Sequence, residues 1–306
     1  MTAKIIDGTT IARAVRAEIG ARAQTLLRQH GIRPGLAVIM IGDNAASAVY
    51  VRNKVRACAD VGIHSQVLRF PASVAESEVL DCIRALNEAD NVHGILVQLP
   101  IPATISLHRV LETLSVDKDV DGFHLYNVGG LVVGDTVFPP CTPYGVQKLL
   151  EHEGIALEGR NVTVVGASNI VGKPMALMLM QREATVAICH AKTRDLAQYT
   201  IIADILVVAA GQPNLIVPQM VRTGAVVIDV GINRLPDGRL VGDVDFEGVR
   251  QKASYITPVP GGVGPMTVTM LLHNTLASAE RAASRPTAPA GARQPDGIPA
   301  PAETDA

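Results

Sequence analysis

The segment Tyr255–Thr267, with the sequence YITPVPGGVGPMT, constrains the fold more than any other part of this chain. It holds three prolines and three glycines and no charged residue. Proline fixes its own backbone angle and lacks an N–H donor, so such a run cannot be the interior of a helix or strand. Because glycine also lets a backbone approach another group closely, the pattern predicts a shaped loop between a short strand and a helix. Composition alone leaves open whether this loop faces a ligand or is a tight structural crossover.

Length and charge limit the class of protein. The 306 residues suffice for two domains, and 48% hydrophobic with only 3% aromatic residues suits aliphatic α/β layers. A net charge of −2 without a basic block argues against nucleic-acid binding and favours small-molecule partners. Lys4 and Asp7 lie where a signal peptide needs an apolar core, and no segment approaches the ~20 apolar residues of a membrane span. We therefore expect a cytoplasmic protein without a membrane partner.

Metal sites are not indicated. The string Asp117–Gly122 copies the first half of a calcium loop, but Val128 occupies the twelfth position, where calcium needs a bidentate glutamate. The eight histidines show no ligand spacing. The four cysteines lie far apart, which favours reduced thiols over a zinc site or a disulfide framework. We predict no metal.

Two series of alternating strands and helices follow one another along the chain. After a helix that Asp7–Thr10 can cap, apolar runs and helical patterns alternate. In the first series, strands are expected at 36–41, 67–70 and 94–99, with helices near 11–19, 45–61 and 73–87. In the second series, strands are expected at 162–165, 185–189, 205–208 and 225–230. Such alternation predicts two parallel sheets with a ligand cleft between the domains.

The turn-rich segment 129–143 is expected to hold the domain boundary. The first domain is assigned to residues 1–140, and the second to 141–265. A helix that begins near Val268 returns to the first domain, which therefore includes residues 266–284. Residues 285–306 are rich in Pro, Gly and Ala with little to bury, and we expect a disordered tail rather than a linker.

A candidate phosphate loop lies in the second series, where Gly166-Ala167-Ser168 separates an expected strand from a helix. The spacing to Gly172 exceeds that of an ATP-binding P-loop by one residue, and Pro174 stands where magnesium needs Ser or Thr, so we exclude an ATPase. After the next strand, Lys192 and Arg194 replace the acid that would hold an NAD ribose. This turn favours NADP, although a merely solvated basic turn remains the alternative.

Candidate polar residues occur in the first series. Helical spacing places Ser47, Tyr50 and Lys54 near one another on one face of a helix. Such a set is most often a group of ordinary surface residues without a catalytic role. Gln98 ends an apolar strand, where α/β proteins build their sites and where a buried amide needs partners. An exposed strand edge is the alternative for Gln98.

Taken together, these strings resemble the bifunctional methylenetetrahydrofolate dehydrogenase/methenyltetrahydrofolate cyclohydrolase family over about residues 3 to 283. The strings are Tyr50 to Lys54, the Gln98 strand, 117–127, 140–143, 166–174, 230–233 and the Pro/Gly segment. Several distinctive motifs in the right order make the resemblance specific, whereas each motif alone could mislead. The resemblance implies an α/β fold with an N-terminal catalytic domain, a Rossmann-like NADP-binding domain and a C-terminal helix that returns to the first domain.

The resemblance also implies roles for the candidate residues. Lys54 would be the polar catalyst of the hydrolytic step, with Gln98 bonded to it. Tyr50 would stack on the folate, Asp121 would bind the edge of the pterin, and both are also counted as catalytic. Further substrate contacts are assigned to Ser47, Gly262 and Pro265. Cofactor contacts are assigned to Gly166, Ala167, Ser168, Ile232, Lys192 and Arg194.

The implied activity has two steps that share one cleft. NADP oxidises 5,10-methylenetetrahydrofolate to 5,10-methenyltetrahydrofolate, and water then opens this cation to 10-formyltetrahydrofolate. Ala167 and Ala191 stand where eukaryotic relatives tend to carry Arg and Ser, so the chain resembles the bacterial branch, in which NADP is usual. A homodimer is implied as well, formed through the second domain. The alternatives are a monofunctional NAD(P)-dependent dehydrogenase and a non-catalytic NADP-sensing protein.

Overall fold

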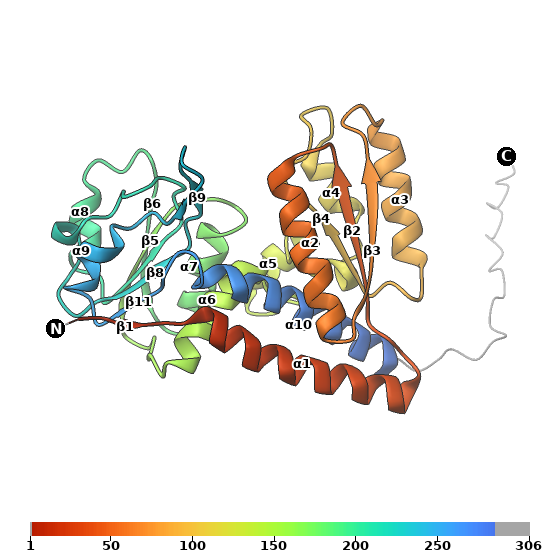
Figure 1. Cartoon of the computed structure of the whole chain (residues 1–306), viewed down its shortest axis with the longest axis horizontal. Coiled ribbons are helices and arrows are strands. Elements are labelled where there is room, and N and C mark those ends of the chain that lie inside the picture. Colours follow the sequence, from red (N-terminus) through yellow and green to blue (C-terminus); the bar gives the residue numbers. More distant parts are fainter. Residues whose placement is uncertain (1, 285–306) are drawn as a thin grey trace, which may run out of the picture.

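The computed structural model describes residues 2–284, which form two lobes above a pair of long helices (Figure 1). The expected disordered tail, 285–306, lies outside the described residues. Both lobes are built on parallel sheets, as the alternating pattern predicted. The α/β class with two domains is therefore confirmed.

The first lobe holds a three-stranded parallel sheet in the order β3-β2-β4. The central strand β2 is buried along its whole length, which explains why the sequence reads there as a continuous apolar run. Its elements are β2 (Gly35–Ile41), α2 (Ala45–Asp60), β3 (His64–Phe70), α3 (Glu76–Glu88), β4 (Gly94–Val97), α4 (Leu107–Thr113) and the 3₁₀ turn η1 (Val116–Lys118). The carboxyl ends of β2 and β4 lie at the same edge of the sheet, close to the start of α2.

The second lobe holds a six-stranded sheet in the order β1-β11-β8-β7-β5-β6, and every pairing in it is parallel. Its strands are β1 (Lys4–Ile5), β5 (Asn161–Val165), β6 (Thr185–Cys189), β7 (Ile205–Val208), β8 (Val226–Asp229) and β11 (Tyr255–Ile256). The helical and remaining elements are α7 (Gly172–Met180), α8 (Leu196–Thr200), η2 (Pro218–Met220), α9 (Phe246–Arg250) and the hairpin β9 (Asn233–Arg234) and β10 (Leu240–Val241). Because β6 and β7 lie on opposite sides of β5, the connections that leave these strands run in opposite directions across the sheet, which creates a crevice at the carboxyl ends of the strands.

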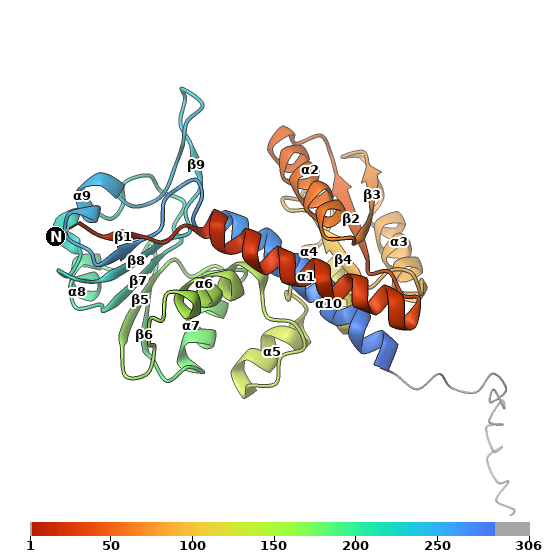
Figure 2. The same ribbon diagram turned by 60° about the horizontal axis from the view of Figure 1, so that its bottom comes forward.

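Two long helices, α1 (Gly8–His30) and α10 (Val263–Ser284), lie side by side beneath both lobes (Figures 1 and 2). The Asp7 carboxylate accepts hydrogen bonds from the N–H groups of Thr9 and Thr10 and caps α1, as expected. Helix α6 (Cys141–His152) packs against α10 as well, so that the largest hydrophobic core runs between the lobes. The return of the C-terminal helix to the first domain is confirmed.

Three details differ from the sequence-based expectations. Strand β1 pairs with β11 and so joins the second sheet, although it precedes every element of the first lobe. The boundary segment is partly helical, because α5 (Leu125–Val133) includes Gly129 and Gly130, and Gly134 caps its end. A Cβ at Gly130 would lie 2.3 Å from the carbonyl oxygen of Asp135, so this glycine serves close packing rather than a turn.

The final helix begins at Val263 and not near Val268. Pro265 therefore lies in its first turn, where the missing N–H costs nothing, since the first N–H groups of a helix have no acceptor within it. The Pro/Gly loop is accordingly shorter than the sequence suggested.

Candidate active site

The Lys54 ammonium of α2 meets Gln98 at the carboxyl end of β4. The Lys54 Nζ donates to Gln98 Oε1 at 3.1 Å, and Gln98 Nε2 donates to the Leu99 carbonyl oxygen at 2.8 Å. A backbone hydrogen bond of 2.9 Å from Gln98 to Ile39 fixes the position of this amide. Both ends of the Gln98 side chain are therefore satisfied, as a partly buried amide requires.

Asp121 lies close enough to Lys54 for the two charges to interact. Burial raises the pKa of the Asp121 carboxyl to about 6, and the positive charge of Lys54 acts in the opposite direction. Asp119, two residues earlier, accepts from the His124 N–H and the Asn127 amide at 2.8 Å each. Its carboxyl pKa is raised by burial as well, and its charge disfavours ionisation of Asp121. Lysine, amide and carboxylate thus form one polar group in an otherwise apolar region.

Asn274 on α10 holds the backbone that precedes Asp121 in place. The Asn274 amide donates to the carbonyl oxygens of Val120 at 2.9 Å and Pro139 at 3.1 Å. The Cys141 thiol donates to the same Val120 oxygen at 3.2 Å, and burial raises the pKa of this thiol well above its usual range. Cys141 is therefore a neutral hydrogen-bond donor here rather than a reactive thiolate. The returning helix thus positions the Asp121 segment.

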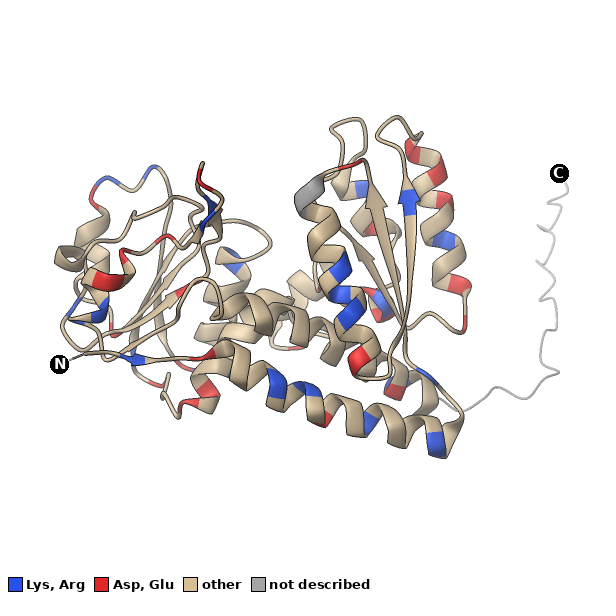
Figure 3. Ribbon diagram, viewed as in Figure 1, with Lys and Arg blue, Asp and Glu red and all other residues tan. Residues whose placement is uncertain are grey.

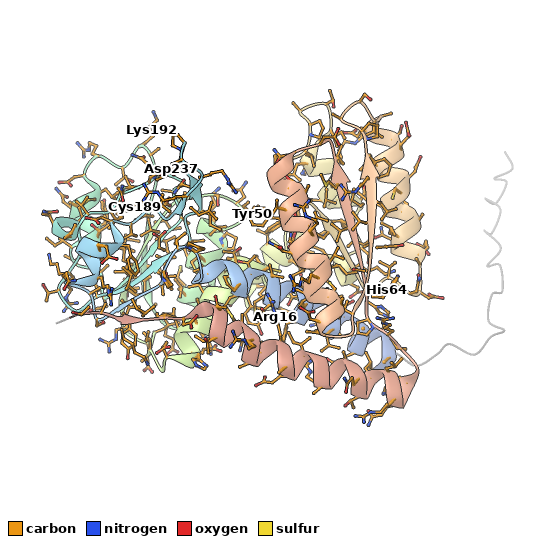
Figure 4. The ribbon with its side chains drawn as sticks, viewed as in Figure 1. Arg16, Tyr50, His64, Cys189, Lys192 and Asp237 are labelled. Atoms are coloured by element: carbon orange, nitrogen blue, oxygen red, sulfur yellow. The ribbon has the colours of Figure 1, made fainter. Side chains whose placement is uncertain are left out.

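A cavity of about 790 Å³ opens between the two lobes, and Tyr50 lies on its wall. The Tyr50 side chain is 42% exposed, which leaves a ring face free for a ligand. Figure 4 shows Tyr50 on the side of α2 that faces the second lobe. Lys54, Gln98 and Asp121 do not line this cavity, because they converge at the end of the first sheet. Two adjoining regions, one aromatic and one polar, therefore make up the site.

The Pro/Gly segment forms the opposite wall of the cavity, including Gly262 and Pro265. It also abuts the start of α1, since the Thr9 N–H donates to the Gly261 oxygen at 3.0 Å. A Cβ at Gly262 would lie 2.6 Å from the Pro258 oxygen, so a side chain has no room there. The segment therefore both lines the cavity and packs against the start of α1, and its contact with a ligand stays a prediction.

Ser47 lies apart from the cavity. Its side chain is 5% exposed, and its hydroxyl donates to the Leu99 oxygen at 3.4 Å. The backbone N–H of Ser47 is bonded at 3.0 Å to Asn44, which caps α2. Ser47 and Lys54, which lie two turns apart on one helix, therefore meet the same strand end, residues 98–99.

The predicted cofactor loop lies at the crevice where the second sheet changes direction. Gly166 has φ +125°, and a Cβ there would lie 2.2 Å from the Ala209 oxygen at the end of β7. A glycine is required at this position by both the backbone angle and the space. A Cβ at Gly172 would in turn lie 2.0 Å from the Gly166 oxygen. The loop is thus folded tightly onto the start of α7, as a phosphate cradle is.

Ser168 and Ala167 complete this loop. The Ser168 hydroxyl accepts hydrogen bonds from the N–H groups of Val171 at 3.1 Å and Gly172 at 3.3 Å. It therefore stabilises the turn into α7 in the way a helix cap does. Ala167, by its small side chain, leaves the mouth of the crevice open. The residues present fit a dinucleotide phosphate at this helix start.

The remaining predicted cofactor residues are exposed. Lys192 and Arg194 line a separate hollow of about 590 Å³ after β6, within reach of the same end of the sheet (Figure 4). Ile232 is 45% exposed and lines the interlobe cavity. Two cations beside the second strand suit a phosphate on the ribose, which fits NADP better than NAD.

A pair of buried carboxylates escaped the sequence analysis. Asp229 ends β8 and is 3% exposed, and Asp243 is fully buried. Asp229 accepts backbone N–H bonds of 3.0 Å from Gly231, Asp243 and Val244. Its place at the carboxyl end of an apolar strand, the signal that identified Gln98, could have revealed it.

Asp243 bonds to loops on both sides of the crevice. One carboxylate oxygen accepts from the N–H groups of Ala210 at 2.7 Å and Gly211 at 2.9 Å, and the other accepts from the Asn233 amide at 2.8 Å. It thereby ties the loop after β7 to the loop that carries Ile232. Nothing in the local sequence distinguishes Asp243 from a solvated turn residue.

Charges are spread over both lobes without a large patch of one sign (Figure 3). Among residues 2–284 no group of three or more His, Cys, Asp or Glu side chains is arranged to hold a metal ion. Within the same residues, every helix is too short or too polar to cross a membrane.

Comparison with known proteins covers most of the chain. The profile described as "Tetrahydrofolate dehydrogenase/cyclohydrolase, catalytic domain" matches residues 6–121, and that of the "NAD(P)-binding domain" of the same family matches residues 140–283. The "Bifunctional protein FolD" of Nitrosospira multiformis is 60% identical over 285 residues, 93% of this chain and 99% of that protein.

Two solved structures are similar along nearly their whole length. The bifunctional FolD enzyme of Campylobacter jejuni is 51% identical with a TM-score of 0.90, over 91% of this chain and 99% of that one. The Trypanosoma brucei methylenetetrahydrofolate dehydrogenase-cyclohydrolase, solved with NADP cofactor and an inhibitor, is 39% identical with a TM-score of 0.90, over 93% and 100%.

Proposed function

Because this chain belongs to the tetrahydrofolate dehydrogenase/cyclohydrolase family, we propose that the Lys54–Gln98–Asp121 group and the adjoining cavity serve both of its reactions. The enzyme oxidises 5,10-methylenetetrahydrofolate with NADP and hydrolyses the methenyl product to 10-formyltetrahydrofolate, in one-carbon metabolism. The observation that carries the proposal is the 3.1 Å hydrogen bond between Lys54 and Gln98 beside a carboxyl of raised pKa.

Lys54 is the group that moves a proton in the hydrolytic step. Water that attacks the methenyl carbon must lose a proton, which a neutral amine held at the reacting carbon can accept and return to the ring nitrogen when the C–N bond opens. The hydroxyl proton of the intermediate is released to solvent as the formyl C=O forms. Gln98 directs the Lys54 nitrogen through its amide oxygen and is itself fixed by Leu99. Asp121 offers a carboxylate to the N–H donors of the pterin edge.

Oxidation needs positioning more than acid or base. NADP, when bound, supplies the acceptor for the hydride that leaves the folate. Tyr50 stacks on the folate, and Gly262 and Pro265 form the backbone wall opposite. Gly166, Ala167 and Ser168 hold the cofactor phosphates at the start of α7, Ile232 contacts the cofactor in the cavity, and Lys192 and Arg194 bind its ribose phosphate.

The test is an absorbance assay with purified protein, 5,10-methylenetetrahydrofolate and either NADP or NAD. We expect reduced cofactor to accumulate without methenyl product, because the second reaction consumes it. Accumulation of methenyl product would instead indicate a monofunctional dehydrogenase. Cofactor binding without turnover would refute both activities.

We propose further that the enzyme is a cytoplasmic homodimer joined through the second domain. In that domain β6 is an edge strand of the sheet, and Ile188, Ile201 and Ile202 on and near it are exposed. A second copy would cover these apolar side chains and the strand edge. Light scattering on the purified protein should give twice the 32.2 kDa mass of one chain, and a monomer would refute this assignment.

A further inference from the structure

Asp119 is a buried carboxyl residue in the loop that carries Asp121. It is 1% exposed, and its backbone lies beside Ile95 of β4 in a parallel bridge. One carboxylate oxygen, Oδ2, accepts hydrogen bonds from the His124 N–H and the Asn127 amide at 2.8 Å each. The other oxygen, Oδ1, is buried without a hydrogen-bond partner within residues 2–284. Because no donor screens this oxygen, the negative charge of the carboxylate acts strongly on the groups around it.

A turn keeps the carboxyl groups of Asp119 and Asp121 together. The Gly122 N–H donates to the Asp119 carbonyl oxygen at 3.1 Å and closes the turn 119–122. Because the pair is two residues apart, its Cα atoms lie at most about 7 Å from each other. Gly122 has φ +76°, and a Cβ there would lie 2.7 Å from the Phe138 oxygen, so the turn has no room to shift. The two carboxyl groups therefore stay close enough for the charge of one to affect the ionisation of the other.

The charged groups that face Asp121 are one cation and one anion. Burial is the largest effect and raises the pKa of the Asp121 carboxyl to about 6, the charge of Lys54 on α2 lowers this pKa, and the charge of Asp119 raises it. The Cys141 thiol of α6 and the Asn274 amide of α10 also lie beside this turn, and both are neutral. Asp119 is therefore the group that opposes Lys54 in setting the charge of Asp121.

The ionisation of Asp119 is itself balanced. Burial, the largest effect, raises the pKa of its carboxyl, whereas the hydrogen bonds from the His124 N–H and the Asn127 amide lower it. The titratable group that faces Asp119 from the start of α5 is the His124 ring, and its positive form also lowers this pKa. The two aspartates thus titrate as a coupled pair, in which ionisation of one disfavours ionisation of the other.

We propose that Asp119 is a positioning residue for both folate reactions, because its charge opposes the ionisation of Asp121 and so sets the lowest pH at which the site binds a pterin. This inference rests on the proposed function, in which the ionised Asp121 accepts hydrogen bonds from the pterin edge. Asp119 acts through Asp121 and does not touch the substrate.

The test is the variant Asp119→Asn, which removes the charge and keeps both hydrogen bonds. The asparagine oxygen takes the place of Oδ2, and its NH₂ group takes the place of the unpartnered Oδ1. We measure kcat/KM for 5,10-methylenetetrahydrofolate against pH at saturating NADP, and we expect its acid limb to move down by about one pH unit. At pH 5 the kcat/KM of the variant should therefore exceed that of the unmodified enzyme about fivefold. Structural damage would lower kcat/KM and cannot produce this gain.

Asp117→Asn is the matched control. It removes the same charge two residues before Asp119, from a side chain that lines a separate hollow with Glu88 and Asp90. Its acid limb should coincide with that of the unmodified enzyme. An unshifted acid limb in Asp119→Asn would overturn the inference, and so would an equal shift in both variants.

A second measurement does not depend on the folding of Asp119→Asn. In unmodified protein with ¹³C-labelled aspartate carboxyls, the Asp121 signal is identified by its loss in Asp121→Asn. We expect this signal to titrate in two steps, because proton uptake by Asp121 depends on the charge of Asp119. A single step would contradict the coupling. An acid limb that persists in Asp121→Asn would instead remove Asp121 as the pterin anchor, so failure of the proposed function is distinguishable from failure of this inference.

Discussion

Asp243 donates its backbone N–H to Oδ1 of Asp229 at 3.0 Å, so that two buried aspartates are linked directly beneath the loops of the second lobe. Between them they accept six hydrogen bonds from the backbone or from Asn233. A Cβ at Gly231 or Gly242 would lie within 2.3 Å of these carboxylates. The loops around the cofactor crevice are thus bonded to these two carboxylates as well as to one another.

Asp243→Asn should weaken NADP binding about tenfold while cyclohydrolase activity remains. An amide that keeps its oxygen toward Ala210 and Gly211 turns its NH₂ toward the Asn233 amide, so that two donors face each other. Calorimetric titration with NADP and a cyclohydrolase assay without cofactor measure the two effects separately. A parallel loss of both activities would point to general unfolding instead.

The matched rescue is the double variant Asp243→Asn with Asn233→Asp. It reverses the donor and acceptor of this hydrogen bond, so NADP affinity should recover in part relative to Asp243→Asn alone. Full recovery is not expected, because Asn233 also donates to the Gly242 oxygen at 3.2 Å and an aspartate cannot. No recovery would contradict the role assigned to this bond.

Lys54→Met should lower the rate of methenyl hydrolysis by about 10² or more and affect dehydrogenation much less, because the hydrolytic step alone needs a proton acceptor. Stopped assays of each half-reaction measure this difference. Arg52→Met, on the exposed side of the same helix, serves as the control and should leave both rates unchanged. Intact hydrolysis in Lys54→Met would show that another group moves the proton.

The kcat/KM for folate should fall as pH drops below about 6, because protonation of Asp121 removes the carboxylate that binds the pterin edge. Asp121→Asn should remove this inflection, and Asp121→Ala should weaken folate binding in both reactions, which share one pterin anchor. pH profiles of both activities with each variant provide the measurement. Unchanged folate affinity in Asp121→Ala would rule out the anchor.

The ionisation of Asp229 should lower stability as pH rises. Burial raises its pKa to about 6 in the folded protein, above the unfolded value of about 3.9, so the folded state binds the proton more tightly between these values. Its contribution to the free energy of unfolding is therefore largest below pH 4 and falls by about 2–3 kcal/mol by pH 6. Urea unfolding of the unmodified protein and Asp229→Asn across this range should show a flatter dependence in the variant. Identical slopes would contradict this prediction.

Much of the fold could be predicted because buried parallel strands read as continuous apolar runs. Strand β7 was predicted at its observed bounds for this reason, and α1 was marked by its Asp7 cap. The bounds of β6 were predicted as well, although β6 is an edge strand that is only partly buried. Strand β1 could not be predicted, because two residues carry no periodic signal and their partner lies far along the sequence. The helical glycines of α5 were misread as a turn, since a sequence does not show which backbone approaches them.

In the candidate site, the polar residues at strand ends could be predicted. The residues that hold these segments in place through distant contacts could not. Gln98 interrupts an apolar run, and this polar residue could therefore be recognised in the sequence as a candidate site residue. Asn274 and Arg16 act through contacts with segments more than 100 residues away, and a single sequence does not show such pairs. The roles assigned to Lys54 and Asp121 stay predictions that the variants above test, and the role of Tyr50 stays a prediction as well.

The pairing of β1 with β11 has a consequence for the order in which the protein can assemble. Lys4 and Ile5 are synthesised well before their partners Tyr255 and Ile256. Until then the edge of β8 that β11 will occupy stays open, and α1 lacks its neighbour α10. During synthesis β1 therefore stays without its partner strand until β11 is made, and α1 can pack against α10 only after that.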